Sequence, residues 1–98
     1  MIYCFDIDDT ICHTKGDSYE EAEPIIKRID YVNKLYDQGN TIIFYTARGY
    51  VTKIDWRDLT LKQLEDWNVK YHDLIPGKPH ADVYIDDKGV KDSDFFDD

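Results

Sequence analysis

Two short apolar runs with an amphipathic helical pattern between them constrain the fold of this chain more than any other feature. Residues 1–7 read MIYCFDI and residues 41–46 read TIIFYT, and both are almost continuously apolar. Such runs are typical of parallel strands that helices cover on both faces. Apolar side chains between the two runs recur at helical spacing: Ile25, Ile26, Ile29, Val32, Leu35 and Tyr36. The alternation predicts an α/β fold with a short central parallel sheet.

The remaining chain continues this pattern. We expect the first helix to start at Pro24 and to end before Gly39. A second helical face follows Asp55, a candidate cap, and carries Trp56, Leu59, Leu64 and Trp67. A short strand around residues 71–75 and a last strand over residues 82–85 would complete the sheet. The polar segment 13–23 is predicted to be a flap or loop over a functional site.

Composition limits the classes of protein to which the chain can belong. With 98 residues, 42% of them hydrophobic, we expect one domain over residues 1–98 with a single core. A net charge of -9 argues against binding to nucleic acid or to anionic lipid, both of which need clustered Lys and Arg. The acidity suggests a metal ion instead.

The cysteines and the apolar segments indicate the compartment. Cys4 and Cys12 form neither a CxxC pair nor a zinc-like pattern with histidines, so we interpret them as reduced packing thiols. The first residues lack the basic start and the long apolar stretch of a signal peptide, and no segment could span a bilayer. The expected location is the cytoplasm.

A reactive polar group follows each predicted strand. Because the carboxyl ends of parallel strands share one edge of a sheet, side chains distant in sequence should meet there. These residues are Asp6 and Asp8 after the first strand, Thr46 after the second, Lys78 after the third, and Asp86 and Asp87 after the fourth.

In this order the residues resemble the four motifs of the haloacid dehalogenase superfamily of phosphotransferases. Asp6, Asp8 and Thr10 match its DxDxT motif, and the second, third and fourth motifs match Thr46, Lys78 and the pair Asp86-Asp87. The resemblance extends from Ile2 to about Lys88 and implies a Rossmann-like three-layer sandwich. About 35 residues separate Thr10 from Thr46, which leaves no room for a cap domain. We therefore expect a small capless member.

The spacing of the first acids suits phosphoryl transfer. Side chains two residues apart on an extended backbone point the same way, so Asp6 and Asp8 can address one substrate. An anionic Asp6 can approach a phosphate only with a cation between them, and Mg²⁺, which prefers oxygen ligands, suits this role.

The resemblance implies a role for each motif residue. Asp6 attacks phosphorus and forms an aspartyl phosphate, while Asp8 protonates the leaving oxygen and later accepts a proton from water. Thr46 and Lys78 hold the phosphoryl oxygens. The implied Mg²⁺ ligands are the Asp6 carboxylate, the Asp8 backbone carbonyl and Asp86, with Asp87 binding directly or through water.

Simpler interpretations stand beside these roles. Asp6 and Asp8, or Asp86 and Asp87, could be ordinary turn residues at strand ends, Thr46 a β-branched strand residue and Lys78 a solvated turn lysine. Asp9 falls outside the two-residue period and is interpreted as a structural cap. Arg48 has the fork that suits phosphate, although an ion pair is nearly as good an explanation. Further candidates for substrate contacts are His13, Lys15, Tyr50 and His80.

The predicted function is a Mg²⁺-dependent phosphatase, a phosphoric monoester hydrolase. Its expected substrate is a phosphorylated sugar or related metabolite, or a larger saccharide, and a role in polysaccharide biosynthesis is one expectation. A site without a cap could borrow a neighbouring subunit to exclude water, so we expect a homo-oligomer. Two alternatives remain open: a receiver-like binding module, and a catalytically degenerate relative that serves as a scaffold.

Overall fold

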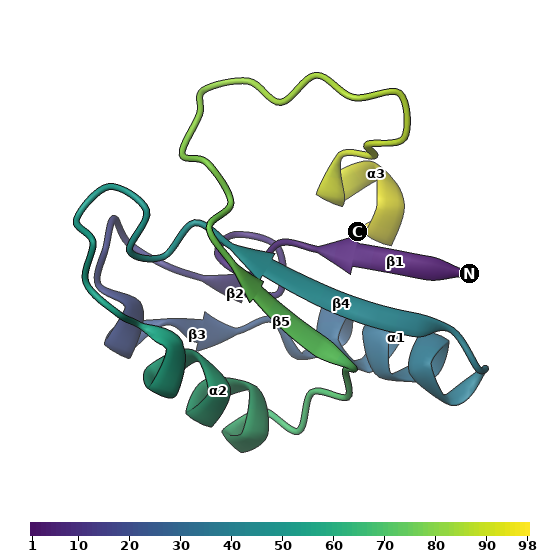
Figure 1. Ribbon diagram of the computed structural model, residues 1–98. Coiled ribbons are helices and arrows are strands. Elements are labelled where there is room, and N and C mark those ends of the chain that lie inside the picture. The colour runs from purple at the N-terminus through teal and green to yellow at the C-terminus, as the bar shows by residue number, and fades with distance from the viewer.

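The computed structural model describes residues 1–98, and a three-stranded parallel sheet lies at its centre (Figure 1). The strands are β1 (Ile2–Phe5), β4 (Thr41–Thr46) and β5 (Asp73–Pro76), in the spatial order β1-β4-β5. Both strand pairs are parallel. The predicted α/β class with a short parallel sheet is confirmed. The first three predicted strands are present, β4 with the predicted ends and β1 and β5 with shifted ends.

The register of the sheet determines which residues meet at its carboxyl edge. Phe5, the last residue of β1, is paired with Phe44, and Thr46 is paired with Pro76 at the end of β5. The chain therefore leaves β1 at Asp6 close to the point where β4 ends, and it leaves β5 just beyond Pro76. This edge collects the polar residues that follow each strand.

Two helices connect the strands at the predicted positions. Helix α1 (Ile26–Asp37) is followed by Gly39, whose φ of 91° is a left-handed conformation that glycine adopts without strain. Helix α2 (Arg57–Asp66) begins where the Asp55 carboxylate accepts a hydrogen bond from the Arg57 backbone N–H at 2.9 Å. Asp55 thus satisfies one free amide of the first turn, as its position in the sequence predicts.

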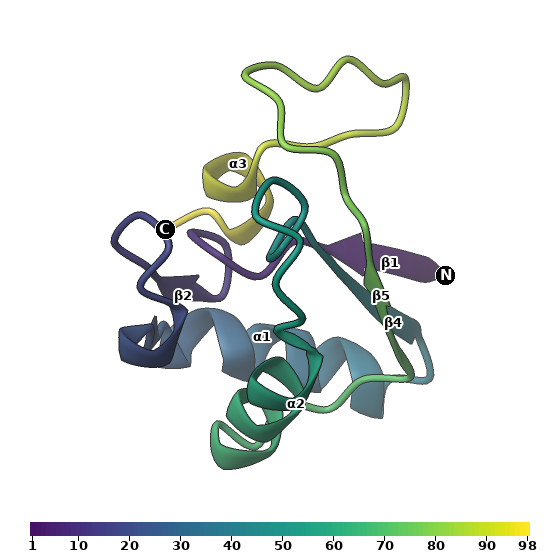
Figure 2. The same cartoon turned by 60° about the vertical axis from the view of Figure 1, so that its left-hand side comes forward.

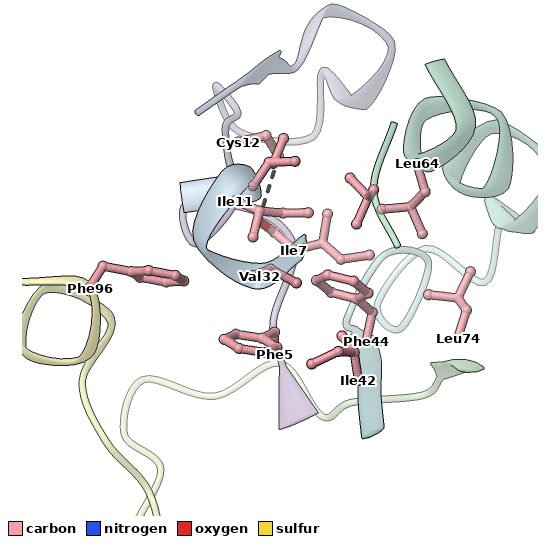
Figure 3. Close-up of a cluster of buried hydrophobic side chains, with 12 residues drawn as sticks. Phe5, Ile7, Ile11, Cys12, Val32, Ile42, Phe44, Leu64, Leu74 and Phe96 are labelled. Carbon is pink, nitrogen blue, oxygen red and sulfur yellow. Dashed lines mark hydrogen bonds between the residues drawn. The ribbon is translucent and has the colours of Figure 1, made fainter. Parts of the chain in front are cut away.

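One hydrophobic core joins the two helices to a single face of the sheet (Figure 3). Phe44 of β4 is fully buried, and so are Val32 of α1 and Leu64 of α2. The opposite face carries side chains that stay accessible, among them Ile2 (69% exposed) and Ile75 (45% exposed). The predicted three-layer sandwich, with helices on both faces of the sheet, is therefore not formed in full, because α1 and α2 share one face and form a single helical layer.

The predicted strand over residues 82–85 is wrong. This segment belongs to a long loop after β5, in which Val83 is 70% and Ile85 95% exposed. Tyr84 turns back toward the start of the loop: its hydroxyl donates to the Pro79 carbonyl, and its ring lies 4.3 Å from Lys78 Nζ. These local contacts take the place of pairing in the main sheet, and β1 stays an edge strand. A short apolar run does not by itself determine which of the two arrangements forms.

The C-terminal residues form an element that the sequence did not reveal. Helix α3 (Asp92–Phe96) lies at the end of the long loop in both views (Figures 1 and 2). Phe96 is buried, and its ring stacks near Phe5 at 5.9 Å between centroids. Arg28 of α1 binds Asp92 at 2.7 Å and Asp98 at 2.8 Å. Aromatic packing and this cation hold α3 against β1 and α1.

The predicted flap contains regular secondary structure. It contains a small antiparallel pair, β2 (Cys12–His13) with β3 (Glu23–Pro24), and the 3-10 turn η1 (Tyr19–Glu21) between them. Figure 1 shows this unit beyond the carboxyl end of β1, apart from the main sheet. No helix of the structure has the length and apolar character needed to cross a membrane.

Candidate active site

Asp6 and Lys78 form the first contact at the carboxyl edge of the sheet. Lys78 Nζ lies 3.0 Å from Asp6 Oδ2, across 72 positions of sequence. The other carboxylate oxygen of Asp6 accepts the Ile7 backbone N–H at 2.8 Å. The Lys78 backbone N–H donates to the Thr46 carbonyl at 3.0 Å, which ties the turn after β5 to the end of β4. The sheet thus brings three of the predicted site residues together.

The ammonium group of Lys78 is enclosed by the Asp6 carboxylate and two tyrosine rings. Its nitrogen lies 4.7 Å from the centroid of Tyr45 and 4.3 Å from that of Tyr84. Burial disfavours the charged form, but the hydrogen bond and the charge of Asp6, together with both tyrosines, outweigh burial and raise the pKa of Lys78. Lys78 therefore stays a cation at neutral pH, as a ligand for phosphoryl oxygens requires.

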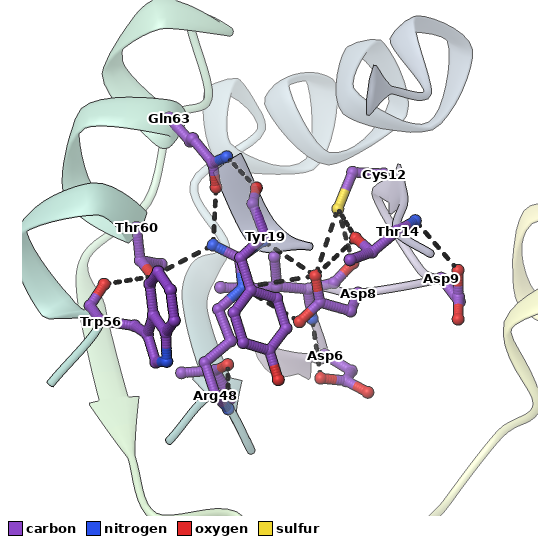
Figure 4. Close-up of polar contacts among 12 residues, drawn as sticks. Asp6, Asp8, Asp9, Cys12, Thr14, Tyr19, Arg48, Trp56, Thr60 and Gln63 are labelled. Carbon is purple, nitrogen blue, oxygen red and sulfur yellow. Dashed lines mark hydrogen bonds and ion pairs between the residues drawn. The ribbon is translucent and has the colours of Figure 1, made fainter. Parts of the chain in front are cut away.

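Asp8 is held by several donors that reach one of its two oxygens (Figure 4). Oδ1 accepts the Thr14 hydroxyl at 2.7 Å and Arg48 Nη2 at 2.8 Å, and the Cys12 thiol approaches at 3.8 Å. Oδ2 accepts a hydrogen bond from Arg48 Nε alone, at 3.0 Å. The two oxygens of this carboxylate consequently differ in their capacity for a further hydrogen bond.

Arg48 is a buried residue whose donors are directed at protein groups. Its side chain is 1% exposed, and Nη1 donates to Thr60 at 3.2 Å and to Gln63 at 2.6 Å. The guanidinium carbon also lies 4.8 Å from the centroid of the Tyr19 ring. Most donors of Arg48 are therefore used by protein groups, and only Nη2 keeps an N–H for the predicted contact with phosphate. The competing interpretation, an ion pair, fits, although the pair is buried rather than on the surface.

Gln63 and Thr60 are site residues that the sequence analysis missed. Gln63 accepts from Arg48 through Oε1 and donates through Nε2 to the Tyr19 carbonyl at 2.6 Å. It therefore links helix α2 to both the flap and the residue that holds Asp8. One signal could have identified the two residues: polar side chains on the face of α2 that must pack inward, since Thr60 is 1% and Gln63 8% exposed.

Thr46 lies at the carboxyl end of β4 with its side chain almost fully covered. It is 5% exposed, and its hydroxyl oxygen accepts the Arg48 backbone N–H at 3.0 Å. We find no acceptor for its hydroxyl proton, so Thr46 can donate to a ligand. The position and the free donor are those that a phosphate-binding threonine needs.

Asp86 and Asp87 are not brought to this edge. Both lie in the exposed loop after β5, and Asp86 accepts the Lys88 backbone N–H at 2.9 Å. This local hydrogen bond is the main reason that the pKa of Asp86 lies below its usual value. No three His, Cys, Asp or Glu side chains are grouped so that they could hold a metal ion. The four predicted metal ligands therefore do not form a set, because the strand that should position the last two is absent.

An acidic cleft of about 550 Å³ opens beside these residues. We define the acidic cleft by four carboxylates in its wall, together with Arg48 and three residues of the long loop. The loop residues are His80, Ala81 and Tyr84, and the carboxylates are Asp6, Asp8, Asp9 and Asp17.

The remaining predicted contact residues are distributed unevenly around the cleft. His80 lines it, whereas His13 and Lys15 do not, and Tyr50 lines a neighbouring cavity. Asp9 has a φ of 60°, and its carboxylate accepts the Thr14 backbone N–H at 3.3 Å. This contact agrees with the structural role expected for Asp9.

Comparison with known proteins supports the fold. No protein-family model matches the chain, and neither does any curated protein. A crystal structure of a structural genomics target from Vibrio cholerae is similar, with a TM-score of 0.88 and 24% sequence identity. The match covers 97% of this chain and 86% of that one. At this level of identity the similarity shows a shared fold and leaves activity to be argued from the site.

Proposed function

We propose that this protein is a phosphoric monoester hydrolase of the haloacid dehalogenase type, with Asp6 as its nucleophile. One observation carries the proposal: an aspartate, a lysine and a threonine from three parallel strand ends converge at one edge of the sheet. Lys78 binds Asp6 through its side chain and Thr46 through its backbone. The same edge is where ligands bind in open α/β folds.

The proposed reaction proceeds in two displacements. An Asp6 carboxylate oxygen attacks phosphorus, the bond from phosphorus to the leaving oxygen breaks, and the leaving oxygen receives a proton. A water molecule then loses a proton, attacks the aspartyl phosphate and releases inorganic phosphate, which regenerates Asp6. Lys78 and the Thr46 hydroxyl donate to the phosphoryl oxygens in both steps and stabilise their charge.

Asp8 is the proposed proton carrier, and its hydrogen bonds indicate which oxygen performs the transfer. Oδ1 is occupied by Thr14 and Arg48, whereas Oδ2 accepts only Arg48 Nε. A carboxylate oxygen has two acceptor sites, so Oδ2 keeps one for a proton. We assign the transfer to Oδ2 and assign to Arg48 the role of holding the carboxylate in place.

Magnesium is included in the proposal only because the resemblance implies it. The residues as arranged do not fit a Mg²⁺ site, because Asp86 and Asp87 lie outside the cleft and Lys78 already neutralises Asp6. No step above depends on the metal. Binding of Mg²⁺ by Asp6 and the Asp8 carbonyl would require an acid from the loop after β5 to move inward.

The proposal is tested by phosphate release from an aryl phosphate, measured with and without Mg²⁺, for the wild type and for Asp6→Asn. We expect Asp6→Asn to lose at least about a thousandfold in kcat, since the amide cannot attack phosphorus. Asp30→Asn is the matched control, because Asp30 is an exposed acid on α1 with no hydrogen-bond partner through its side chain. Acid quenching followed by mass spectrometry should place one phosphoryl group on the peptide that contains Asp6.

A binding module without catalytic activity is the second candidate. Asp86 and Asp87 lie outside the cleft, which favours the binding module, because a catalytically degenerate relative would lose its metal site. The same assay separates the two candidates. If the wild type turns over no phosphate ester with or without Mg²⁺ while it still binds phosphate, the hydrolase proposal is wrong and the binding module is correct.

A further inference from the structure

A second cavity, of about 630 Å³, lies next to the acidic cleft and differs from it in charge. We call it the basic cavity. Its wall contains three cations, Arg48, Lys53 and Arg57, and Asp55 as its one carboxylate. The four aspartates of the acidic cleft are absent from this wall. In a chain with 21 acidic and 12 basic residues, such a surplus of positive charge in one hollow is unusual.

Two of these cations are free to bind a ligand. Arg48 is used by Asp8, but Lys53 and Arg57 form no salt bridge with any acid of the chain. Lys53 Nζ lies 4.8 Å from the centroid of the Tyr50 ring, and Arg57 donates one hydrogen bond, from Nη1 to the Leu74 carbonyl at 3.2 Å. The guanidinium of Arg57 therefore keeps most of its donors for an anion.

The turn after β4 lines both hollows, since Gly49 and Ile54 are part of each wall. Gly49 has a φ of 80°, and a β-carbon at this position would collide with the Ile54 carbonyl oxygen. Backbone hydrogen bonds from Tyr50 to Ala47 and from Lys53 to Gly49, at 2.9 Å and 2.8 Å, close the turn. This turn places Lys53 beside the basic cavity, and the residue is part of the cavity wall.

The basic cavity begins at the phosphoryl site itself. Thr46 and Gly77 are both part of its wall, and Gly77 directly precedes Lys78. Trp56 is shared by the cavity and the cleft and provides an apolar surface between them. A substrate whose phosphate lies beside Asp6 and Lys78 can therefore extend past Thr46 toward Lys53 and Arg57.

We propose that the basic cavity binds a second anionic group on the leaving group of the substrate. This inference rests on the proposed hydrolase function and narrows its substrate class to sugar phosphates that carry a carboxylate or another phosphate. Lys53 and Arg57 are the specificity residues, and Trp56 packs against the sugar ring. The residues that transfer the phosphoryl group are not involved in this selection.

The test compares three substrates that share one ring: glucose 1-phosphate, glucuronic acid 1-phosphate and glucose 1,6-bisphosphate. We expect kcat/KM to be about tenfold higher for the anionic sugar that the cavity fits than for glucose 1-phosphate, because the added anion gains one or two charge-assisted hydrogen bonds. The second and third substrates distinguish a carboxylate from a phosphate. Lys53→Gln and Arg57→Gln should remove the preference and leave glucose 1-phosphate unaffected. Lys34→Gln, an exposed lysine on α1 without a salt bridge, is the control for net charge.

A binding measurement separates failure of this inference from failure of the hydrolase function. Trp56 fluorescence in Asp6→Asn/Trp67→Phe, titrated with the same three sugars, reports occupancy without turnover. Tighter binding of an anionic sugar that is lost in Arg57→Gln supports the basic cavity even if the wild type hydrolyses nothing. Equal binding of all three sugars, or a preference that survives both Gln substitutions, overturns the inference.

Discussion

The guanidinium of Arg48 binds both oxygens of Asp8, with Nη2 2.8 Å from Oδ1 and Nε 3.0 Å from Oδ2. The two residues are 40 positions apart in sequence. Gln63 and Thr60 of α2 hold the other side of the guanidinium, at 2.6 Å and 3.2 Å. The ion pair therefore has support from a helix, and it fixes the direction in which Asp8 presents its free acceptor site.

Replacing Arg48 by Lys should lower kcat far more than it changes KM. Lysine keeps the charge but cannot form two hydrogen bonds to a carboxylate and two more to Thr60 and Gln63. We expect kcat to fall about a hundredfold, the size of effect that a misplaced acid-base group produces. Steady-state kinetics with an aryl phosphate measures both constants. A large rise in KM with unchanged kcat would instead show that Arg48 binds the substrate phosphate.

Arg28 should stabilise the protein by holding α3 in place. Arg28→Gln loses the ion pairs with Asp92 and Asp98 and the hydrogen bond from Nη1 to the Thr10 carbonyl at 3.1 Å. We expect the melting temperature at pH 7 to fall by about 5 °C. Lys27→Gln, an exposed neighbour, is the control and should change it little.

The stabilisation by Arg28 should depend on pH. Hydrogen bonds from Arg28 lower the pKa of Asp92 and of Asp98 in the folded protein. A carboxyl group with a depressed folded pKa contributes stability above its unfolded pKa of about 3.9, and this contribution disappears as the pH falls through the folded pKa. The difference in melting temperature between wild type and Arg28→Gln should thus be largest near pH 6 and become smaller below about pH 4. A difference that stays constant from pH 7 to pH 3 would contradict this assignment.

The two thiols should react at very different rates. Cys4 is exposed, whereas Cys12 is fully buried. Burial raises the pKa of Cys12 to about 11, so at pH 8 only about one Cys12 in a thousand is a thiolate. Titration with a thiol reagent should label one cysteine per native chain rapidly and the second only in denaturant. Cys4→Ser should remove the rapid phase, and rapid labelling of Cys12 would show that the flap opens readily.

The dependence of turnover on magnesium tests the resemblance, because the residues as arranged do not form a metal site. If the loop after β5 moves inward to bind Mg²⁺, chelation by EDTA abolishes phosphate release, and Asp86→Asn loses more activity than Asp87→Asn, as the resemblance implies. Because both acids lie outside the cleft, binding should also slow amide exchange over residues 80–90. Full activity in EDTA would remove the metal from the proposal and leave the nucleophile Asp6 in place.

Much of the scaffold follows from local sequence patterns. Strand β4 covers the predicted residues 41–46, and α1 ends before Gly39, as the helical spacing indicates. The meeting of Asp6 with Lys78 could be predicted too, because the carboxyl ends of parallel strands share an edge. In each case the signal is periodic or lies within a few residues of a strand end.

Other features depend on which surfaces come into contact, and the sequence does not encode that locally. Asp86 and Asp87 follow an apolar run like those of the true strands, yet the contacts of Tyr84 with the turn after β5 keep the run out of the sheet. Helix α3 was missed because an acidic segment with two phenylalanines forms a helix only when it can pack against Phe5 and Arg28. Both outcomes are determined by long-range packing.

The sequence by itself determined the parallel α/β scaffold and the set of reactive groups at its carboxyl edge, because periodicity and strand ends are local properties. Only the tertiary structure decided how those groups are paired. Arg48 has the chemistry to bind phosphate, but once Thr60 and Gln63 surround it and Asp8 lies within 2.8 Å, its donors serve the protein. A buried charge must be paired to be tolerated, and the available partner is set by the fold.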